Sequence, residues 1–203
     1  MKKLSIDHPF FEFMGGLGDW MILNVLFVVT SLPVVTIGAS LTAMYRVSLR
    51  RIRKESRYAS REYMQAFREE WKDSTKPWMI FLCTGGILLF DILYGKNLPK
   101  VLNLAIGCLV VLWAFAFTYV FPLQARFKNG IKNTFVNALY LAFCNLPVTI
   151  IMTALNSIPV LCAASGVFVV MAAMPIFCII GFALIIWVNS LCLTVIFAKF
   201  ANT

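Results

Sequence analysis

Residues 20–44 of the chain read WMILNVLFVVTSLPVVTIGASLTAM, and none of these side chains is charged. A helix needs about 20 consecutive apolar residues to cross the hydrocarbon core of a bilayer, which is roughly 30 Å thick. The stretch Trp20–Met44 is long enough to meet this requirement. It therefore predicts a first membrane-spanning helix.

Four more apolar stretches follow the first one along the chain. They predict spans over Pro77–Gly95, Val101–Ala125, Asn133–Asn156 and residues 165–198. A turn is expected at Asn156–Pro159, because proline cannot continue a helix interior. The sequence predicts one all-α domain over residues 1–203, a polytopic membrane helix bundle of about five transmembrane helices.

The last apolar stretch is difficult to divide, because Val160–Ala198 is too long for one crossing and short for two. Pro175 and Gly181 interrupt it. Our interpretation is one long, kinked helix whose first part lies shallow in the membrane or is re-entrant. Two short crossings are the alternative.

The composition of the whole chain agrees with a membrane environment. Of its 203 residues, 61% are hydrophobic and 13% are charged, and the mean hydropathy is +0.84. Soluble domains contain about 25% charged residues, and a soluble sphere of this size cannot hide so much apolar surface from water. These values exclude a soluble enzyme, a disordered chain and a disulfide-stapled secreted domain.

The basic residues are concentrated in the polar loop 45–76, which holds ten of the eighteen Lys and Arg residues. By the positive-inside rule, this loop, the stretch Arg126–Lys132 and Lys199 lie in the cytoplasm. Five spans then place the amino terminus outside and the carboxyl terminus in the cytoplasm. No nucleic-acid-binding motif accompanies the charge, so the expected partner of the basic loop is the anionic lipid surface and not nucleic acid.

A helical pattern is present inside the basic loop. Tyr63, Phe67 and Trp71 recur at intervals of four residues and form one apolar stripe, with charged residues on the remaining surface. The pattern predicts an amphipathic cytoplasmic helix between the first and second spans. Such a helix either lies at the lipid interface as a connector or docks on a partner.

Two blocks of the sequence resemble a known family. The run SLPVVTIGAS at Ser31–Ser40 resembles the first-span signature of the YesL-like family of small bacterial integral membrane proteins, which have no assigned activity. A second block is similar to the same family in Phe121-Pro122, Ala125-Arg126-Phe127 with Asn129, Asn137-Ala138-Leu139 and Leu146-Pro147 with Thr149. The resemblance implies about five spans in a bacterial cell membrane. It also implies an association with carbohydrate uptake systems of the ATP-binding-cassette type and with sensor kinases, and it makes Arg126 and Asn129 candidates for partner docking.

Four residues within the spans are candidates for a solute site or a gate. Asp91 is an intramembrane carboxylate, although it lies near the end of its helix, where interfacial water is within reach. Pro33 and Pro147 interrupt two spans, and Gly38 lets a second helix approach closely. Broken helices bind solutes in transporters, whereas a packing kink is the structural alternative.

The sequence contains little that could perform chemistry. Its six cysteines are scattered singly and it has one histidine, so no metal or cofactor site can be built from their spacing. We therefore expect no enzyme and no cofactor. The expected function is that of a non-catalytic accessory subunit, associated with carbohydrate uptake or sensing, whose partners are permease subunits or a sensor kinase. The alternative is a small stand-alone transporter or channel.

Overall fold

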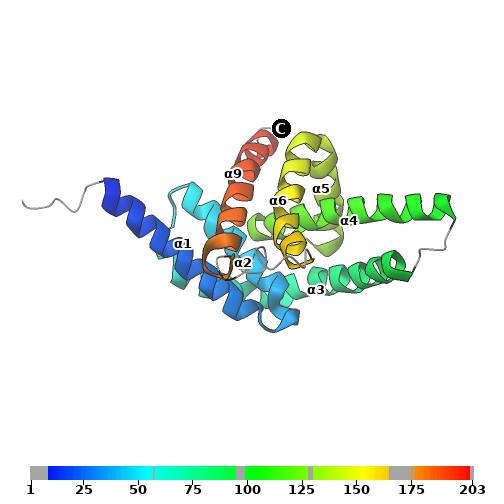
Figure 1. Ribbon diagram of the computed structural model, residues 1–203. Helices are drawn as coiled ribbons and strands as arrows, with labels where there is room; N and C mark the ends of the chain where they lie inside the picture. Colours follow the sequence, from blue (N-terminus) through cyan, green and yellow to red (C-terminus); the bar gives the residue numbers. More distant parts are fainter. Residues whose placement is uncertain are drawn as a thin grey trace, which may run out of the picture.

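The computed structural model describes residues 9–56, 58–94, 99–127, 130–164, 175 and 177–201, and all regular structure within these ranges is helical. This confirms the all-α class for the described residues. The elements are α1 (Pro9–Ser31), η1 (Val34–Thr36), α2 (Ile37–Ile52), α3 (Ala59–Tyr94), α4 (Lys100–Arg126), α5 (Ile131–Cys144), α6 (Leu146–Ala164), η3 (Phe177–Gly181) and α9 (Phe182–Ala201). The helices gather around one core, from which the outer ends of α3 and α4 project (Figure 1).

The first apolar stretch forms a hairpin of two helices, α1 and α2. Pro33 is extended between them, because proline has no backbone N–H and disfavours helical geometry in the residue before it. At the open end of the hairpin, Arg51 Nη2 donates a hydrogen bond to Asp19 Oδ2 at 2.8 Å. The prediction of one spanning helix over Trp20–Met44 is therefore wrong, because the chain doubles back at Pro33.

Hydroxyl groups hold the tip of this hairpin against α3. The Thr30 Oγ1 atom lies 2.6 Å from the Tyr63 hydroxyl and accepts a hydrogen bond from Ser40 Oγ at 2.9 Å. Thr36 Oγ1 donates to the backbone carbonyl of Thr30 at 2.6 Å. That carbonyl belongs to the last turn of α1, where helical partners are missing. The protein thus supplies the hydrogen bonds that an interrupted helix needs in an apolar environment.

Helix α3 is one continuous helix of 36 residues. Its amino-terminal half carries the charged segment that we expected as a separate amphipathic helix. Its carboxyl-terminal half contains the predicted second span, Pro77–Gly95, as far as Tyr94, the last residue of α3. Pro77 lies between the halves without ending the helix. The charged half packs on α2 and the apolar half packs on α4.

Helix α4 coincides with the predicted third span, Val101–Ala125. Aromatic rings join it to α3 and α5. The ring centre of Phe81, on α3, lies 5.6 Å from that of Trp113, 5.5 Å from Phe117 and 5.9 Å from Phe121 on α4. It also lies 5.2 Å from Phe135 on α5. Rings at these separations attract one another beyond the effect of burial alone.

The predicted fourth span is bent, because α5 and α6 meet at an angle of 111°. Thr149 Oγ1 bridges the bend by donating to the carbonyl of Ala142 at 2.9 Å. Pro147 stands in the first turn of α6, where its missing N–H is not needed. Helix α6 then continues through Asn156–Pro159, so the prediction of a turn there is wrong.

The last predicted span is described only in its second part, since residues 165–174 lie outside the described residues. Phe177–Gly181 forms one π-helical turn, which agrees with the irregularity that Gly181 predicted. The turn leads into α9, and Ile179–Lys199 is apolar and long enough to cross a membrane.

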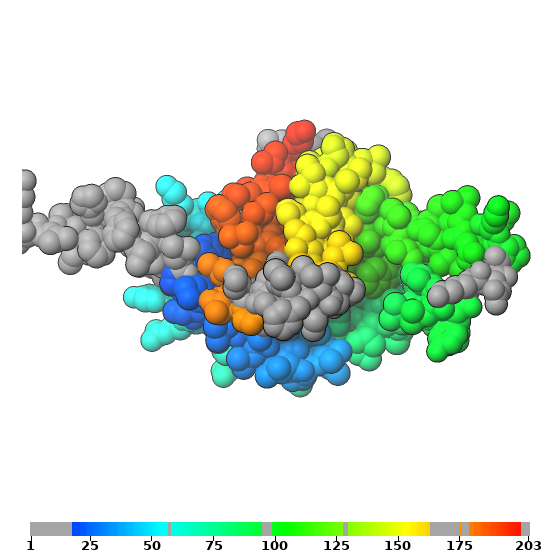
Figure 2. Space-filling model, in the orientation of Figure 1, coloured from blue at the N-terminus to red at the C-terminus, as the bar shows by residue number. Residues whose placement is uncertain are grey.

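Three helices of the described residues are long and apolar enough to span a membrane, or four if the bent α5–α6 pair forms one span. They account for three or four of the five spans that we expected. The outer faces of these helices expose large apolar side chains, among them Phe90, Leu104, Val136, Ile150 and Val195. Figure 2 shows α6 and α9 side by side above the α1–α2 hairpin, with the α3–α4 pair projecting to one side.

Candidate functional site

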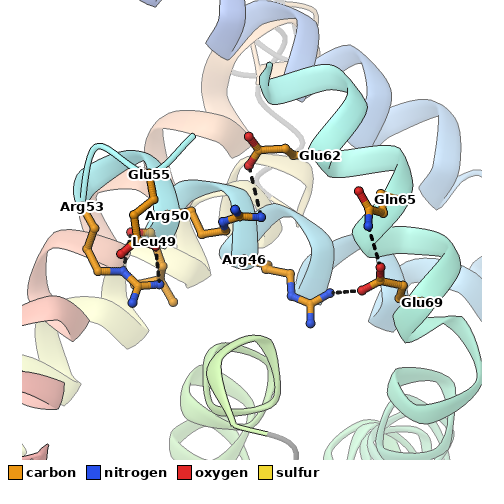
Figure 3. Close-up of polar contacts among 8 residues, drawn as sticks. All are labelled: Arg46, Leu49, Arg50, Arg53, Glu55, Glu62, Gln65 and Glu69. Atoms are coloured by element: carbon orange, nitrogen blue, oxygen red, sulfur yellow. Dashed lines mark hydrogen bonds and ion pairs between the residues drawn. The ribbon is translucent and has the colours of Figure 1, made fainter. Parts of the chain in front are cut away.

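A charged pocket lies where the end of α2, the charged half of α3 and the end of α4 meet. It encloses about 430 Å³, a volume in the range of small-molecule sites. Figure 3 shows the walls that α2 and α3 contribute. The polar residues that line the pocket are Arg46, Arg50, Arg53, Arg126, Glu55, Glu62, Glu69 and Gln65.

Ion pairs between α2 and α3 give this pocket its shape. Arg46 binds two carboxylates of α3, with Nη1 at 2.8 Å from Glu69 Oε2 and Nη2 at 3.1 Å from Glu70 Oε1. One turn further along α2, Arg50 Nη1 lies 3.6 Å from Glu62 Oε2. Partly exposed pairs such as Arg46–Glu69 and Arg50–Glu62 contribute little singly, about 0–1 kcal/mol each, whereas Glu70 is buried. Here they fix the register of the two helices, so that the arginines face the pocket.

Arg126, at the end of α4, forms the opposite wall. Its guanidinium lies over the rings of Phe197 and Phe127, 4.9 Å and 5.5 Å from their centres. Within the described residues, no carboxylate pairs with it. Its charge is repelled by that of Arg53 and attracted, less strongly, by the carboxylate of Glu55, and both of these residues line the same pocket. This side of the pocket therefore carries two arginines, and Glu55 neutralises part of their charge.

A second pocket of about 490 Å³ shares Glu69 and Phe127 with the charged pocket. Its walls come from α3, the end of α4 and the start of α5, and they include Glu70, Asp73, Lys76, Gln124 and Thr134. Polar segments of four helices, α2 to α5, thus meet in two neighbouring pockets, of which the first is rich in arginine and the second in carboxylates.

The structure separates the members of the predicted docking stripe. Tyr63 is fully buried beneath the α1–α2 hairpin, and Phe67 packs partly buried against the core. Trp71 alone of the three is exposed, with 49% of its surface accessible. The stripe is therefore not one docking surface, because the returning hairpin covers its first residue.

Of the other predicted docking residues, Arg126 lies in the charged pocket and Asn129 lies outside the described residues. Asp91 stands near the outer end of α3, where the helix projects from the core, and its side chain is partly exposed. The structure does not bring Asp91 to the charged pocket.

Pro33 and Gly38 lie where the tip of the hairpin packs on α3. A Cβ atom added at Gly38 would lie 2.5 Å from Trp78 Cβ and 2.6 Å from the carbonyl oxygen of Ser74. Next to Pro33, the indole Nε1 of Trp78 donates to the carbonyl of Val34 at 2.7 Å. The protein's own side chains therefore occupy this break. Pro147 is exposed at the start of α6 and lines neither polar pocket.

Our reading of the sequence missed a polar chain inside the bundle. Asn189 Nδ2, on α9, donates to the Tyr45 hydroxyl at 3.3 Å and to Asn156 Oδ1 at 2.8 Å. Asn156 Nδ2 then reaches Thr118 Oγ1 at 3.4 Å. The buried Asn189 Oδ1 has no hydrogen-bond partner among the described residues. The available signal was an amide side chain within each of two long apolar runs.

The part of the chain that the structure describes holds no group of three His, Cys, Asp or Glu side chains able to bind a metal ion. The charged pocket has both acidic and basic walls and offers chiefly arginine donors and carboxylate acceptors. This arrangement suits an anion that also carries hydrogen-bond donors.

One family model matches the chain. It is described as "Protein of unknown function, DUF624" and covers residues 20–92, which include α2 and most of α3. Neither the curated proteins nor the solved structures contain a match to this chain. The similarity covers the α2 and α3 walls of the charged pocket and stops before Arg126.

Proposed function

We propose that the protein is a non-catalytic accessory subunit of a membrane complex. The observation that carries this proposal is the division of α3 into a charged half and an apolar half without a break. A rigid helix of this kind joins a surface outside the membrane to spans within it. The match to a family of unknown function is compatible with such a role.

The surface that we propose for docking lies on the charged half of α3. Trp71 is exposed there between the exposed side chains of Arg68 and Lys72. Exposed tryptophan and arginine are typical of the residues that dominate the binding energy of protein interfaces. The link to carbohydrate uptake or sensing, with permease subunits or a sensor kinase as partners, comes from the resemblance to the YesL-like family of bacterial membrane proteins.

Trp71→Ala is the variant that tests this proposal. We expect permease or sensor subunits to co-purify with the wild-type protein in mild detergent and to be lost from the variant by about tenfold or more, the usual effect of removing a central tryptophan. Quantitative mass spectrometry of the purified complexes measures this loss. Tyr94→Ala is the matched control, since it removes an exposed aromatic at the other end of the same helix. Unchanged partner levels in the Trp71 variant would contradict the docking surface.

We also propose a revised orientation in a bacterial cell membrane. The positive-inside rule places Arg51 in the cytoplasm, and the bond between Arg51 and Asp19 then places the start of the hairpin on the same side. This differs from the expected outside location of the amino terminus. Protease access to a tag inserted before Asp19 checks it, because cleavage only from outside would contradict the revision.

A stand-alone transporter is the second candidate function. The buried carbonyl oxygen of Asn189, which has no hydrogen-bond partner among the described residues, favours it, since polar groups inside membrane bundles often mark substrate pathways. Purified protein in liposomes tests this function by uptake of labelled monosaccharides and disaccharides. Uptake by the wild type that Asn189→Leu abolishes would support transport. Uptake that is equal with and without protein would count against transport of these sugars.

A further inference from the structure

We propose that the charged pocket binds a phosphate ester that also carries hydroxyl groups, with Arg53 and Arg126 holding the phosphate. Both the headgroup of phosphatidylglycerol and a soluble sugar phosphate have this chemistry. The inference goes beyond the accessory role and does not depend on a partner protein.

The first argument concerns the hydrogen-bond donors of the Arg126 guanidinium. Its face is covered by the rings of Phe197 and Phe127, which attract the positive charge but accept none of the N–H groups in the guanidinium plane. No carboxylate among the described residues takes these donors. They are available to an anion that enters the pocket.

The second argument is the like charge on the neighbouring wall. Arg53 lines the same pocket, and its Nη2 atom is 3.6 Å from Glu55 Oε2, longer than a normal hydrogen bond. The charges of Arg53 and Arg126 repel each other, and the carboxylate of Glu55 offsets this repulsion only in part. A phosphate between them would replace this repulsion with two attractions, and the planar fork of arginine matches phosphate oxygens in pairs.

The third argument concerns the acidic walls, which select among anions. Glu55, Glu62 and Glu69 line the pocket together with the arginines. Carboxylates accept hydrogen bonds and repel a bare dianion. Hydroxyl groups on the alcohol part of the phosphate ester would donate hydrogen bonds to these carboxylates. The pocket of about 430 Å³ has room for both parts of such a ligand.

The position of the pocket brings it within reach of lipid headgroups. Arg126 is the last residue of α4, a helix apolar enough to span a membrane. Basic pockets at the ends of transmembrane helices meet anionic headgroups at this depth. A soluble ester would reach the same pocket from the water side.

The experiment measures binding to the purified full-length protein in a nonionic detergent. Short-chain phosphatidylglycerol and phosphatidylcholine serve as lipid probes, and binding is measured by native mass spectrometry. We expect the wild type to prefer phosphatidylglycerol, and Arg53→Gln and Arg126→Gln each to weaken its binding about tenfold or more, as for the loss of one charge-assisted pair. Arg61→Gln is the matched control, because Arg61 is an exposed arginine on α3 that lines neither polar pocket.

A competition arm distinguishes the two sources of the ligand. Displacement of the lipid by millimolar glycerol 3-phosphate identifies a soluble ester, whereas resistance to it identifies the lipid headgroup, and either result supports the proposal. Equal binding by all four proteins, or an equal loss in Arg61→Gln, would overturn it. If Arg126→Gln does not fold, Arg126→Lys keeps the charge without the fork, and unchanged binding by that variant would also count against the proposal. Because the readout needs no partner, failure of the co-purification experiment leaves this result unaffected.

Discussion

Gly38→Ala is expected to destabilise the protein by about 2 kcal/mol, the typical size of an overpacking effect between closely packed elements. The added Cβ atom would lie 2.5 Å from Trp78 Cβ and 2.6 Å from the carbonyl oxygen of Ser74. Neither atom is the flexible end of a side chain, so α2 and α3 must separate to make room. Separation would also stretch the hydrogen bonds that hold the tip of the hairpin on α3.

Thermal unfolding in detergent, monitored by size-exclusion chromatography, measures the effect of this substitution. Gly86→Ala is the control within α3, because nothing lies within 4 Å of the Cβ atom it would add. Alanine is favoured over glycine in helices by roughly 0.5–1 kcal/mol, so the control is expected to be neutral or slightly stabilised. If both variants unfold at the same temperature as the wild type, α2 and α3 do not approach each other at Gly38.

Phe81→Ala is expected to reduce the free energy of unfolding by about 3 kcal/mol, within the usual cost of removing a buried phenyl ring. Phe81 is 2% exposed and meets the rings of Trp113, Phe117, Phe121 and Phe135. Lipid is as apolar as the protein core. The loss therefore comes from ring contacts and from the cavity that remains, and little of it from transfer out of water.

Phe90→Ala provides the comparison for this variant, since Phe90 lies on the same helix with 61% of its surface exposed. We expect Phe90→Ala to unfold near the wild-type temperature and Phe81→Ala to unfold well below it. Reconstitution in lipid nanodiscs keeps Phe90 in an apolar environment during the measurement. Equal losses in the two variants would show that Phe81 does not sit at the centre of the aromatic cluster.

The prolines show where sequence reasoning succeeded and where it failed. Each of four prolines removes one backbone donor, yet Pro33 separates two helices and Pro147 begins one, whereas Pro77 and Pro159 lie inside helices. The local chemistry is the same in all four cases. What differs is the surroundings. At Pro33, Thr36 and Trp78 bind carbonyl groups near the break, and these contacts come from the tertiary structure.

The apolar stripe of the basic loop illustrates the same distinction. The spacing of Tyr63, Phe67 and Trp71 predicted one face of a helix, and all three lie in α3. The spacing could not indicate which neighbour would cover that face. The α1–α2 hairpin covers Tyr63 and leaves Trp71 exposed. Of the three residues in the stripe, only Trp71 therefore presents an exposed side chain.

By itself, the sequence determined that the chain is helical and suited to a membrane. It also located the apolar segments that form α4, α9 and the second half of α3, because the thickness of a bilayer sets the length of apolar chain required. The tertiary structure alone decided that the first apolar stretch returns to Arg51, that α5 and α6 are bent, and that Arg53 and Arg126 share one pocket. Hydrophobic length is a property of each segment taken separately. A hairpin, a bend or a charged pocket depends on which groups distant in sequence satisfy one another's hydrogen bonds and charges, and only the packed chain contains that information.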